Sequence, residues 1–178
     1  ASAYLNPDAA RGLYDNAEVI SRILAGIRKN GLVKRLESSF YAFCKSLKAF
    51  RQANENMIDM WNNDKIFIAP DLDINALIEA GYSEEEIEQK MNEKAEVNPK
   101  NASFQRKDFD EQYIEQLRHD QALLDDMWLE WEYIDDDDDS KFAKFEDLLK
   151  HELFKKERNP EGKIVVFSDS VDTVEYLQ

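Results

Sequence analysis

Residues 32–61 read LVKRLESSFYAFCKSLKAFRQANENMIDMW and decide the fold. Large apolar residues recur there at alternating steps of four and three, with the polar Asn54 counted in the stripe: Leu36, Phe40, Phe43, Leu47, Phe50, Met57 and Trp61. This spacing is typical of a helix that buries one seam along its length, and neither Pro nor Gly interrupts it. A helix of about 30 residues is roughly 45 Å long. We expect the rest of the chain to pack along it.

The composition indicates a globular, helix-rich protein. The chain has 178 residues, of which 43% are hydrophobic, and this is enough for one domain with a core. Five Gly and four Pro favour long helices over a turn-rich sheet protein. The single cysteine, Cys44, cannot form an internal disulfide and lies beside the apolar seam, so we expect a small buried side chain. No signal peptide or membrane span is evident, and we expect a cytoplasmic protein with no membrane partner.

The net charge of −15 is unevenly distributed. Residues 17–51 hold eight Lys and Arg against two Glu, a balance of +6, whereas residues 66–178 hold 13 basic against 31 acidic residues, a balance of −18. An acidic surface repels nucleic acid, but a local basic face can attract it. The face of the long helix opposite its seam is therefore the part of the chain most suited to a polyanion.

The first helix precedes the long one. Asn16 can cap it, and Asn30-Gly31 is expected to end it. Its apolar side should fold back onto the start of the long helix in a tight hairpin, through Val19, Ile20, Ile23, Leu24 and Ile27.

Short elements follow the long helix. Residues 65–70 (KIFIAP) form either a short strand or an extended plug, and residues 74–80 a short helix. Ser83 and Glu86 have the spacing of a capping box, which predicts a helix over about 84–94. Residues 96–107 are expected to form a loop.

A second long helix is predicted over about 109–134, capped by Asp108 and antiparallel to the first. Five aspartates, 135–139, then suggest a solvated linker. Asp139 or Ser140 can cap a last helix over about 141–156.

The C-terminal residues have a different pattern. A turn at 159–162 precedes KIVVF (163–167), a continuous β-branched run that suits a strand buried on both faces, and a helix with Val171, Val174 and Leu177 follows. Strand, short loop and helix are half of a βαβ unit. We expect the rest of this sheet to lie beyond Gln178, and the start without Met also suggests a piece of a longer polypeptide. The predicted fold is mainly α: an elongated helical bundle or hairpin around two long antiparallel helices, with one short C-terminal βα unit.

Two stretches carry a resemblance to a known family. GKIVVFSDSVDTVEYLQ (162–178) resembles the opening of the second motor lobe of Swi/Snf-like superfamily-two helicases, although Asp169 stands where that family often has Gln. KRLESSFYAFCKSLKAF (34–50) is similar to the helix that precedes this lobe in bacterial helicase-related proteins. The two stretches cover about a third of the chain, and residues 65–159 resemble nothing we can name.

The resemblance implies a helical insertion domain between two motor lobes over 1–160 and the start of a second RecA-like lobe over 161–178. Its partners would be the remaining lobes of the same polypeptide and DNA or RNA. ATP and Mg²⁺ are implied for the parent protein, an ATP-dependent helicase. This chain has no phosphate-cradling Gly-x-x-x-x-Gly-Lys-Ser/Thr motif, so we expect it to be non-catalytic and to hold no cofactor. The alternative is a stand-alone acidic protein-interaction module or nucleic-acid mimic.

Candidate binding residues lie mainly on the long helix. Nucleic-acid phosphates are expected to contact its basic residues, and the resemblance adds Ser168: Lys34, Arg35, Lys45, Lys48, Arg51 and Ser168. The competing interpretation is a solvated face, or ion pairs with acids of the same chain. A metal site is a remote alternative, built from two i, i+4 pairs: Glu115 with His119 and Asp147 with His151.

Overall fold

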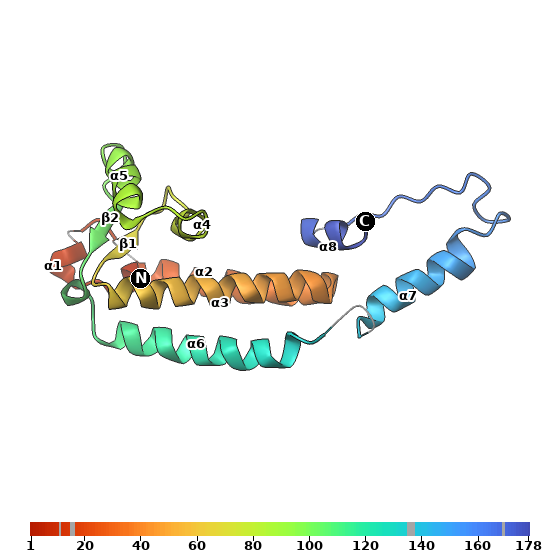
Figure 1. The fold of residues 1–178 in the computed structure, drawn as a ribbon, viewed down its shortest axis with the longest axis horizontal. Coiled ribbons are helices and arrows are strands. Elements are labelled where there is room, and N and C mark those ends of the chain that lie inside the picture. Colours follow the sequence, from red (N-terminus) through yellow and green to blue (C-terminus); the bar gives the residue numbers. More distant parts are fainter. Residues whose placement is uncertain (11, 15–16, 135–137, 169) are drawn as a thin grey trace. The chain divides into compact units, whose positions relative to one another are not determined.

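The chain folds mainly into helices, as predicted, and we describe it from a computed structural model (Figure 1). The structure describes residues 1–10, 12–14, 17–134, 138–168 and 170–178. The main helices, with two 3₁₀ turns beside them at Ser2–Tyr4 and Arg106–Asp108, are α1 (Pro7–Ala10), α2 (Ala17–Ser38), α3 (Phe40–Asn62), α4 (Ile74–Glu79), α5 (Glu84–Ala95), α6 (Gln112–Trp131), α7 (Ser140–Leu148) and α8 (Val171–Tyr176). Strands β1 (Ile66–Ile68) and β2 (Ala102–Phe104) are the two strands of the described residues.

The break between the first two long helices lies eight residues later than predicted. Asn30 and Gly31 lie inside α2, and the interruption is at Ser39. Gly31 is not among the glycines with positive φ, so it does not end the helix as a left-handed cap would. Ser39 acts as a cap instead, because its Oγ accepts the Ala42 N–H at 3.1 Å. The predicted cap Asn16 lies outside the described residues.

The apolar side of α2 is exposed, which corrects the predicted hairpin packing. Its five β-branched and leucine side chains all retain about half or more of their accessible surface: Val19, Ile20, Ile23, Leu24 and Ile27. Periodicity identified the helix and its apolar stripe correctly. It did not identify what covers the stripe, because periodicity shows only that a face is apolar.

The structure divides into two compact units, each made of two segments of the chain. Unit 1 comprises residues 1–26 and 50–124, and unit 2 comprises residues 27–49 and 125–178. The predicted domain boundary at residue 160 concerns the parent polypeptide and stays a prediction.

Unit 1 contains the larger core. Its buried side chains come from α3, β1, α4, α5 and α6, together with Phe109 just before α6. They are Met60, Ile66, Phe67, Ile74, Ile87, Met91, Phe109, Tyr113 and Leu117. In this unit α3 and α6 are antiparallel, as predicted. Asn54 Nδ2 donates to the Leu117 carbonyl at 2.9 Å, whereas the Trp61 ring, further along α3, meets Tyr113, which is earlier in α6.

Two boundaries in unit 1 differ from the prediction. The predicted loop 96–107 contains β2, which pairs antiparallel with β1 in the register Ile66↔Phe104. Asp108 does not cap α6; its carboxylate accepts the Gln105 N–H at 2.8 Å, and Asp110 accepts the Gln112 N–H at 2.8 Å. The capping box at Ser83 and the short helices α4 and α5 are confirmed.

Unit 2 is built around the first half of α3. Ala42, Phe43 and Leu47 are buried there, and the Trp131 ring lies 4.6 Å from the Phe43 ring between centroids. Asp139 is the cap of α7, as predicted, because one carboxylate oxygen accepts the N–H groups of Lys141 and Phe142. The predicted last helix runs on from α7 as a π-helical segment, Leu149–Leu153. Asp135–Asp137 lie outside the described residues.

The predicted strand at 163–167 does not form. These residues have no regular secondary structure, and Phe167 is 92% exposed. A parallel strand depends on neighbours for its hydrogen bonds. Within the described residues, the sheet consists of β1 and β2 alone and does not include this segment. Helix α8, predicted to follow it, is confirmed.

Candidate functional site

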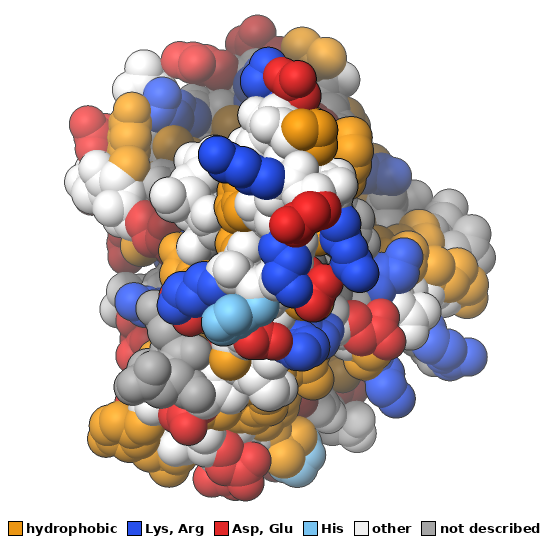
Figure 2. All heavy atoms as spheres, turned by 90° about the vertical axis from the view of Figure 1, so that its right-hand side faces the viewer, with side chains coloured by type: hydrophobic (Ala, Val, Ile, Leu, Met, Phe, Trp, Pro, Cys, Tyr) orange, Lys and Arg blue, Asp and Glu red, His pale blue; other side chains and the backbone are white. Residues whose placement is uncertain are grey.

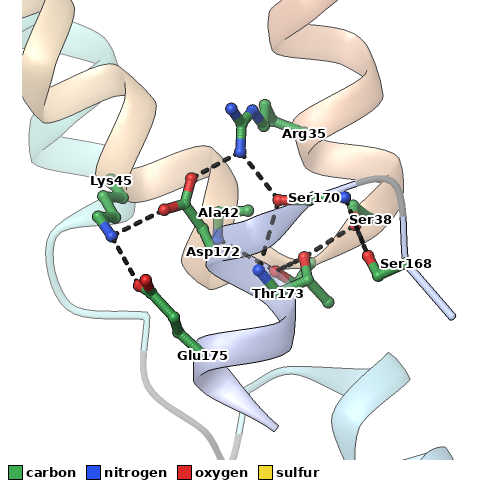
Figure 3. Close-up of polar contacts among 10 residues, drawn as sticks. Arg35, Ser38, Ala42, Lys45, Ser168, Ser170, Asp172, Thr173 and Glu175 are labelled. Carbon is green, nitrogen blue, oxygen red and sulfur yellow. Dashed lines mark hydrogen bonds and ion pairs between the residues drawn. The ribbon is translucent and has the colours of Figure 1, made fainter. Parts of the chain in front are cut away.

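The strongest candidate site lies in unit 2, where α8 meets the end of α2 and the start of α3 (Figure 3). The two stretches that carry the family resemblance supply all of its side chains. Two features make the contact: a set of ion pairs and a cluster of hydroxyl groups.

The ion pairs converge on Asp172, in the first turn of α8. Arg35 Nη1 lies 2.6 Å from Asp172 Oδ2, and Lys45 Nζ lies 2.7 Å from Asp172 Oδ1. Lys45 also reaches Glu175 Oε2, at 3.0 Å. Thus one cation from α2 and one from α3 each bind a separate oxygen of a single carboxylate.

These contacts change the ionisation of both partners. The hydrogen bond from Lys45 lowers the pKa of Asp172, and Arg35 lowers it further against the opposing effect of burial. The same hydrogen bond, together with that to Glu175, raises the pKa of Lys45. Both groups are therefore charged at neutral pH, and the attraction between them is present there.

The hydroxyl cluster centres on Thr173. Its Oγ1 lies 2.8 Å from Ser38 Oγ and 2.9 Å from Ser39 Oγ, and Ser38 Oγ also lies 3.3 Å from Ser168 Oγ. Ser170 caps α8 by accepting the Thr173 N–H at 3.3 Å. Thr173 is only 6% exposed. Polar atoms thus form the buried side of α8.

The apolar residues of α8 lie elsewhere. Val171 is 72% exposed and Val174 is also exposed. The apolar pattern of α8 therefore does not mark the face by which the helix docks, which is the face of Asp172 and Thr173. Two aromatic contacts add to the docking. The Tyr176 ring stacks on Tyr41 with centroids 5.1 Å apart and with nearly parallel planes, and its centroid lies 5.0 Å from that of Phe142 in α7.

The predicted nucleic-acid residues fall into two groups. Arg35 and Lys45 are ion-paired with α8, as the competing interpretation expected, and Ser168 is part of the hydroxyl cluster. Lys34 and Lys48 are exposed. Arg51 is half-buried and makes an interaction of its own. Figure 2 views the side on which α7 lies, and Lys and Arg side chains are interspersed there with Asp and Glu.

The residues of the remote metal alternative do not make a ligand set in the described residues, where no group of three or more His, Cys, Asp and Glu side chains is placed to hold an ion. His151 Nδ1 lies 3.0 Å from Asp147 Oδ1 on one helix, and both are exposed. Glu115 and His119 are exposed on α6.

The thiol of Cys44 is half-buried rather than fully buried. It points to the Trp131 carbonyl, with Sγ 3.7 Å from the oxygen, and burial raises its pKa. A raised pKa keeps a thiol protonated and unreactive. Cys44 is therefore a packing residue.

Sequence reasoning missed six members of this site: Ser38, Ser39, Ser170, Asp172, Thr173 and Glu175. All six lie in the two stretches that carry the resemblance, but nothing in the sequence indicated that the stretches are in contact. Asp169, where the family often has Gln, lies outside the described residues.

Comparisons with protein-family models, with curated proteins and with solved structures find no match to the chain. The helices of the described residues include none with the length and apolar character needed to cross a membrane.

Proposed function

We propose that this chain is a non-catalytic part of an ATP-dependent, Swi/Snf-like nucleic-acid helicase or translocase. Residues 1–160 are its inter-lobe helical segment and residues 161–178 begin its second motor lobe. The segment positions the motor lobes on DNA or RNA in the cytoplasm. ATP and Mg²⁺ act in the parent protein's lobes.

One observation supports the proposal most strongly. The two stretches that resemble the family, 128 residues apart from Lys34 to Gly162, contact each other through Arg35, Ser38 and Ser39 on one side and Asp172 and Thr173 on the other. A coincidental resemblance of two unrelated stretches gives no reason for such a contact.

The geometry also suits a positioning role. A helix of six residues is unstable in water on its own. The position of α8 therefore depends on its docking to the α2–α3 junction. A lobe that begins with this helix would take its orientation from the junction.

The test needs the parent polypeptide. We expect the reading frame to continue past Gln178 into further helicase motifs. In that protein, Arg35→Ala should reduce nucleic-acid-stimulated ATP hydrolysis several-fold, because it removes an ion pair from the lobe junction. Arg118→Ala, on the exposed surface of α6, is the matched control and should leave the rate unchanged. A reading frame without helicase motifs, or equal rates in both variants, would contradict the proposal.

The exposed stripe of α2 supports the second candidate, a stand-alone acidic protein-interaction module. Five exposed apolar side chains on one helix face are typical of a contact surface. Ile23→Asn and Leu24→Asn should abolish capture of a partner in this case. If the chain is instead part of a helicase, as proposed above, the same two substitutions should leave ATP hydrolysis by the parent protein unaffected.

A further inference from the structure

The carboxylates of α8 occupy positions in which a phosphate group would find the same partners. Arg35 and Lys45 approach Asp172 from two helices, at 2.6 and 2.7 Å, and bind different oxygens. Guanidinium and ammonium groups bind phosphate oxygens, as they bind carboxylate oxygens, through charge-assisted hydrogen bonds. The hydroxyl groups of Ser38 and Ser39, which Thr173 contacts, could serve a phosphate as further hydrogen-bond donors.

More cations lie next to this pair. Lys48 follows Lys45 by three residues, so both lie on one face of α3, and Lys34 precedes Arg35. Lys34 and Lys48 are exposed, and the side chains of Arg35 and Lys45 remain 39% and 49% exposed. Each of these cations is therefore accessible to a phosphate from solvent, and Lys45 and Lys48 lie on one face of α3.

An aromatic ring lies beside the cations. Tyr41 is exposed on one side and stacked on Tyr176 of α8 on the other, and Lys45 Nζ lies 5.9 Å from its centroid. If α8 leaves, the Tyr41 ring loses its stacking partner. An unpaired base of a single strand can replace it, because every base offers a flat face.

We propose that Arg35, Lys45 and Lys48, with Tyr41 as a stacking platform, form a single-stranded nucleic-acid site that α8 blocks with Asp172 and Glu175. This inference rests on the nucleic-acid part of the proposed function and adds its regulation. The acidic helix competes with the phosphodiester backbone for the same cations, so binding requires α8 to undock.

Helix α8 and a nucleic-acid strand can displace each other reversibly from these cations. Exposed ion pairs are individually weak. Helix α8 is covalently tethered, however, and competes at an effective concentration on the order of mM. A single phosphate in solution would not displace it, whereas a strand that engages several cations and the Tyr41 ring together would.

The test uses the 178-residue chain and a fluorescein-labelled oligothymidylate, with binding followed by fluorescence anisotropy at about 50 mM salt. Asp172→Asn with Glu175→Gln removes the competing charges of three ion pairs, Arg35–Asp172, Lys45–Asp172 and Lys45–Glu175. It should tighten binding about tenfold, the effect expected from a few partly exposed ion pairs. Glu157→Gln with Glu161→Gln makes the same charge change at exposed positions of unit 2 and is the matched control. It should change binding less than about twofold.

Two further variants complete the test. Adding Arg35→Ala and Lys45→Ala to the tight-binding variant should cancel the gain and lower the slope of log affinity against log salt by about 1.4, for two phosphate contacts on a single strand. The second variant adds Ser38→Cys, Thr173→Cys and Cys44→Ala to the tight-binding variant. A disulfide between positions 38 and 173 should hold α8 in place, so the oligonucleotide should bind more tightly only after the disulfide is reduced. The hydroxyl oxygens it replaces lie 2.8 Å apart.

Equal tightening by the control pair would show that net charge alone acts and would overturn the inference. Unchanged affinity after loss of Arg35 and Lys45, or full binding in the oxidised disulfide form, would also overturn it. These outcomes are distinct from failure of the proposed function. If oligonucleotide binding does not depend on α8 but ATP hydrolysis by the parent protein still depends on Arg35, the inference fails and the proposed function stands.

Discussion

Thr173→Val tests whether hydroxyl contacts hold α8 in place. The substitution keeps the volume of the side chain and removes its hydroxyl group. That hydroxyl contacts Ser38 Oγ at 2.8 Å and Ser39 Oγ at 2.9 Å, and Thr173 is nearly fully buried. The variant therefore leaves two serine hydroxyls facing a methyl group.

The expected cost follows from this geometry. Each serine hydroxyl keeps one other contact, Ser39 Oγ with the Ala42 N–H and Ser38 Oγ with Ser168 Oγ. The variant therefore loses two hydrogen bonds at about 0.5–1.5 kcal/mol each, or about 1–3 kcal/mol in all. This corresponds to roughly a 5- to 150-fold shift in the equilibrium between docked and undocked α8. Because α8 has only six residues, undocking should also melt it.

Amide hydrogen exchange measures this equilibrium directly. In the docked helix the Val174 N–H donates to the Ser170 carbonyl and the Leu177 N–H to the Thr173 carbonyl. Both amides should exchange faster in Thr173→Val by the stated factor, while amides of α5 in unit 1 keep their rates.

Two variants serve as controls. Thr173→Ser keeps the hydroxyl and loses one methyl group, worth about 0.8 kcal/mol, so it should accelerate exchange by no more than about fourfold. Ser38→Ala should cost less in the Thr173→Val background than in the unmodified chain, because its Thr173 partner is already absent. If Thr173→Ser disturbs α8 as much as Thr173→Val does, packing rather than hydrogen bonding holds the helix and the reasoning is wrong.

Four further outcomes are expected. Docking of α8 should weaken in acid: Asp172 has a lowered folded-state pKa, so its contribution is present above the ordinary Asp pKa of about 3.9 and is lost as pH falls through the lowered value. The protection factor of the Val174 amide, measured against pH, reports this loss, and its pH dependence should flatten in Asp172→Asn. Ile87→Ala, in the core of unit 1, should lower the free energy of unfolding by about 2–5 kcal/mol in urea titrations, and a loss below 1 kcal/mol would contradict the core assignment. Ser83→Ala breaks the capping box of α5 and should cost about 1 kcal/mol in the same assay. Ile23→Asn, on the exposed face of α2, should change stability by less than about 0.5 kcal/mol; a larger loss would mean that this face is buried in solution.

Features with a local cause were predictable from the sequence. The capping box of α5 depends on residues three positions apart, and the cap of α7 lies within three residues of the N–H groups that it accepts. The seam of α3 follows from periodicity in the same way, although the helix begins at Phe40 and not at the predicted Leu32. Such features need no knowledge of distant residues. Two local predictions were nevertheless wrong, the cap at Asp108 and the helix end at Asn30-Gly31.

Most features that depend on distant residues were not predictable, and the antiparallel packing of α3 and α6 is the exception because both helices are long and carry an apolar stripe. Strand β2 has three residues and exists because β1, more than thirty residues earlier, pairs with it. The Asn30-Gly31 dipeptide resembles a helix end, yet the modest cost of these residues in a helix, about 1 kcal/mol for glycine, is outweighed in α2. The contact of Thr173 with Ser38 and Ser39 spans more than 130 residues, and no spacing rule reaches that far.

The two faces of α8 lead to opposite expectations for anything that binds it. Asp172 and Glu175 hold Arg35 and Lys45, so a polyanion that needs these cations must displace the helix. Val171 and Val174 are exposed on the docked helix, so an apolar surface can cover them with the polar contacts intact.

Hydrogen exchange separates these two kinds of ligand. An apolar surface, such as a β-sheet, that packs on Val171 and Val174 buries additional surface only when α8 is docked. It therefore stabilises the docked state and should slow amide exchange at Val174 and Leu177. An oligonucleotide should accelerate it, because it binds the undocked state. If both ligands slow exchange, the polyanion binds without competing with Asp172, and the cations around α8 are not its site.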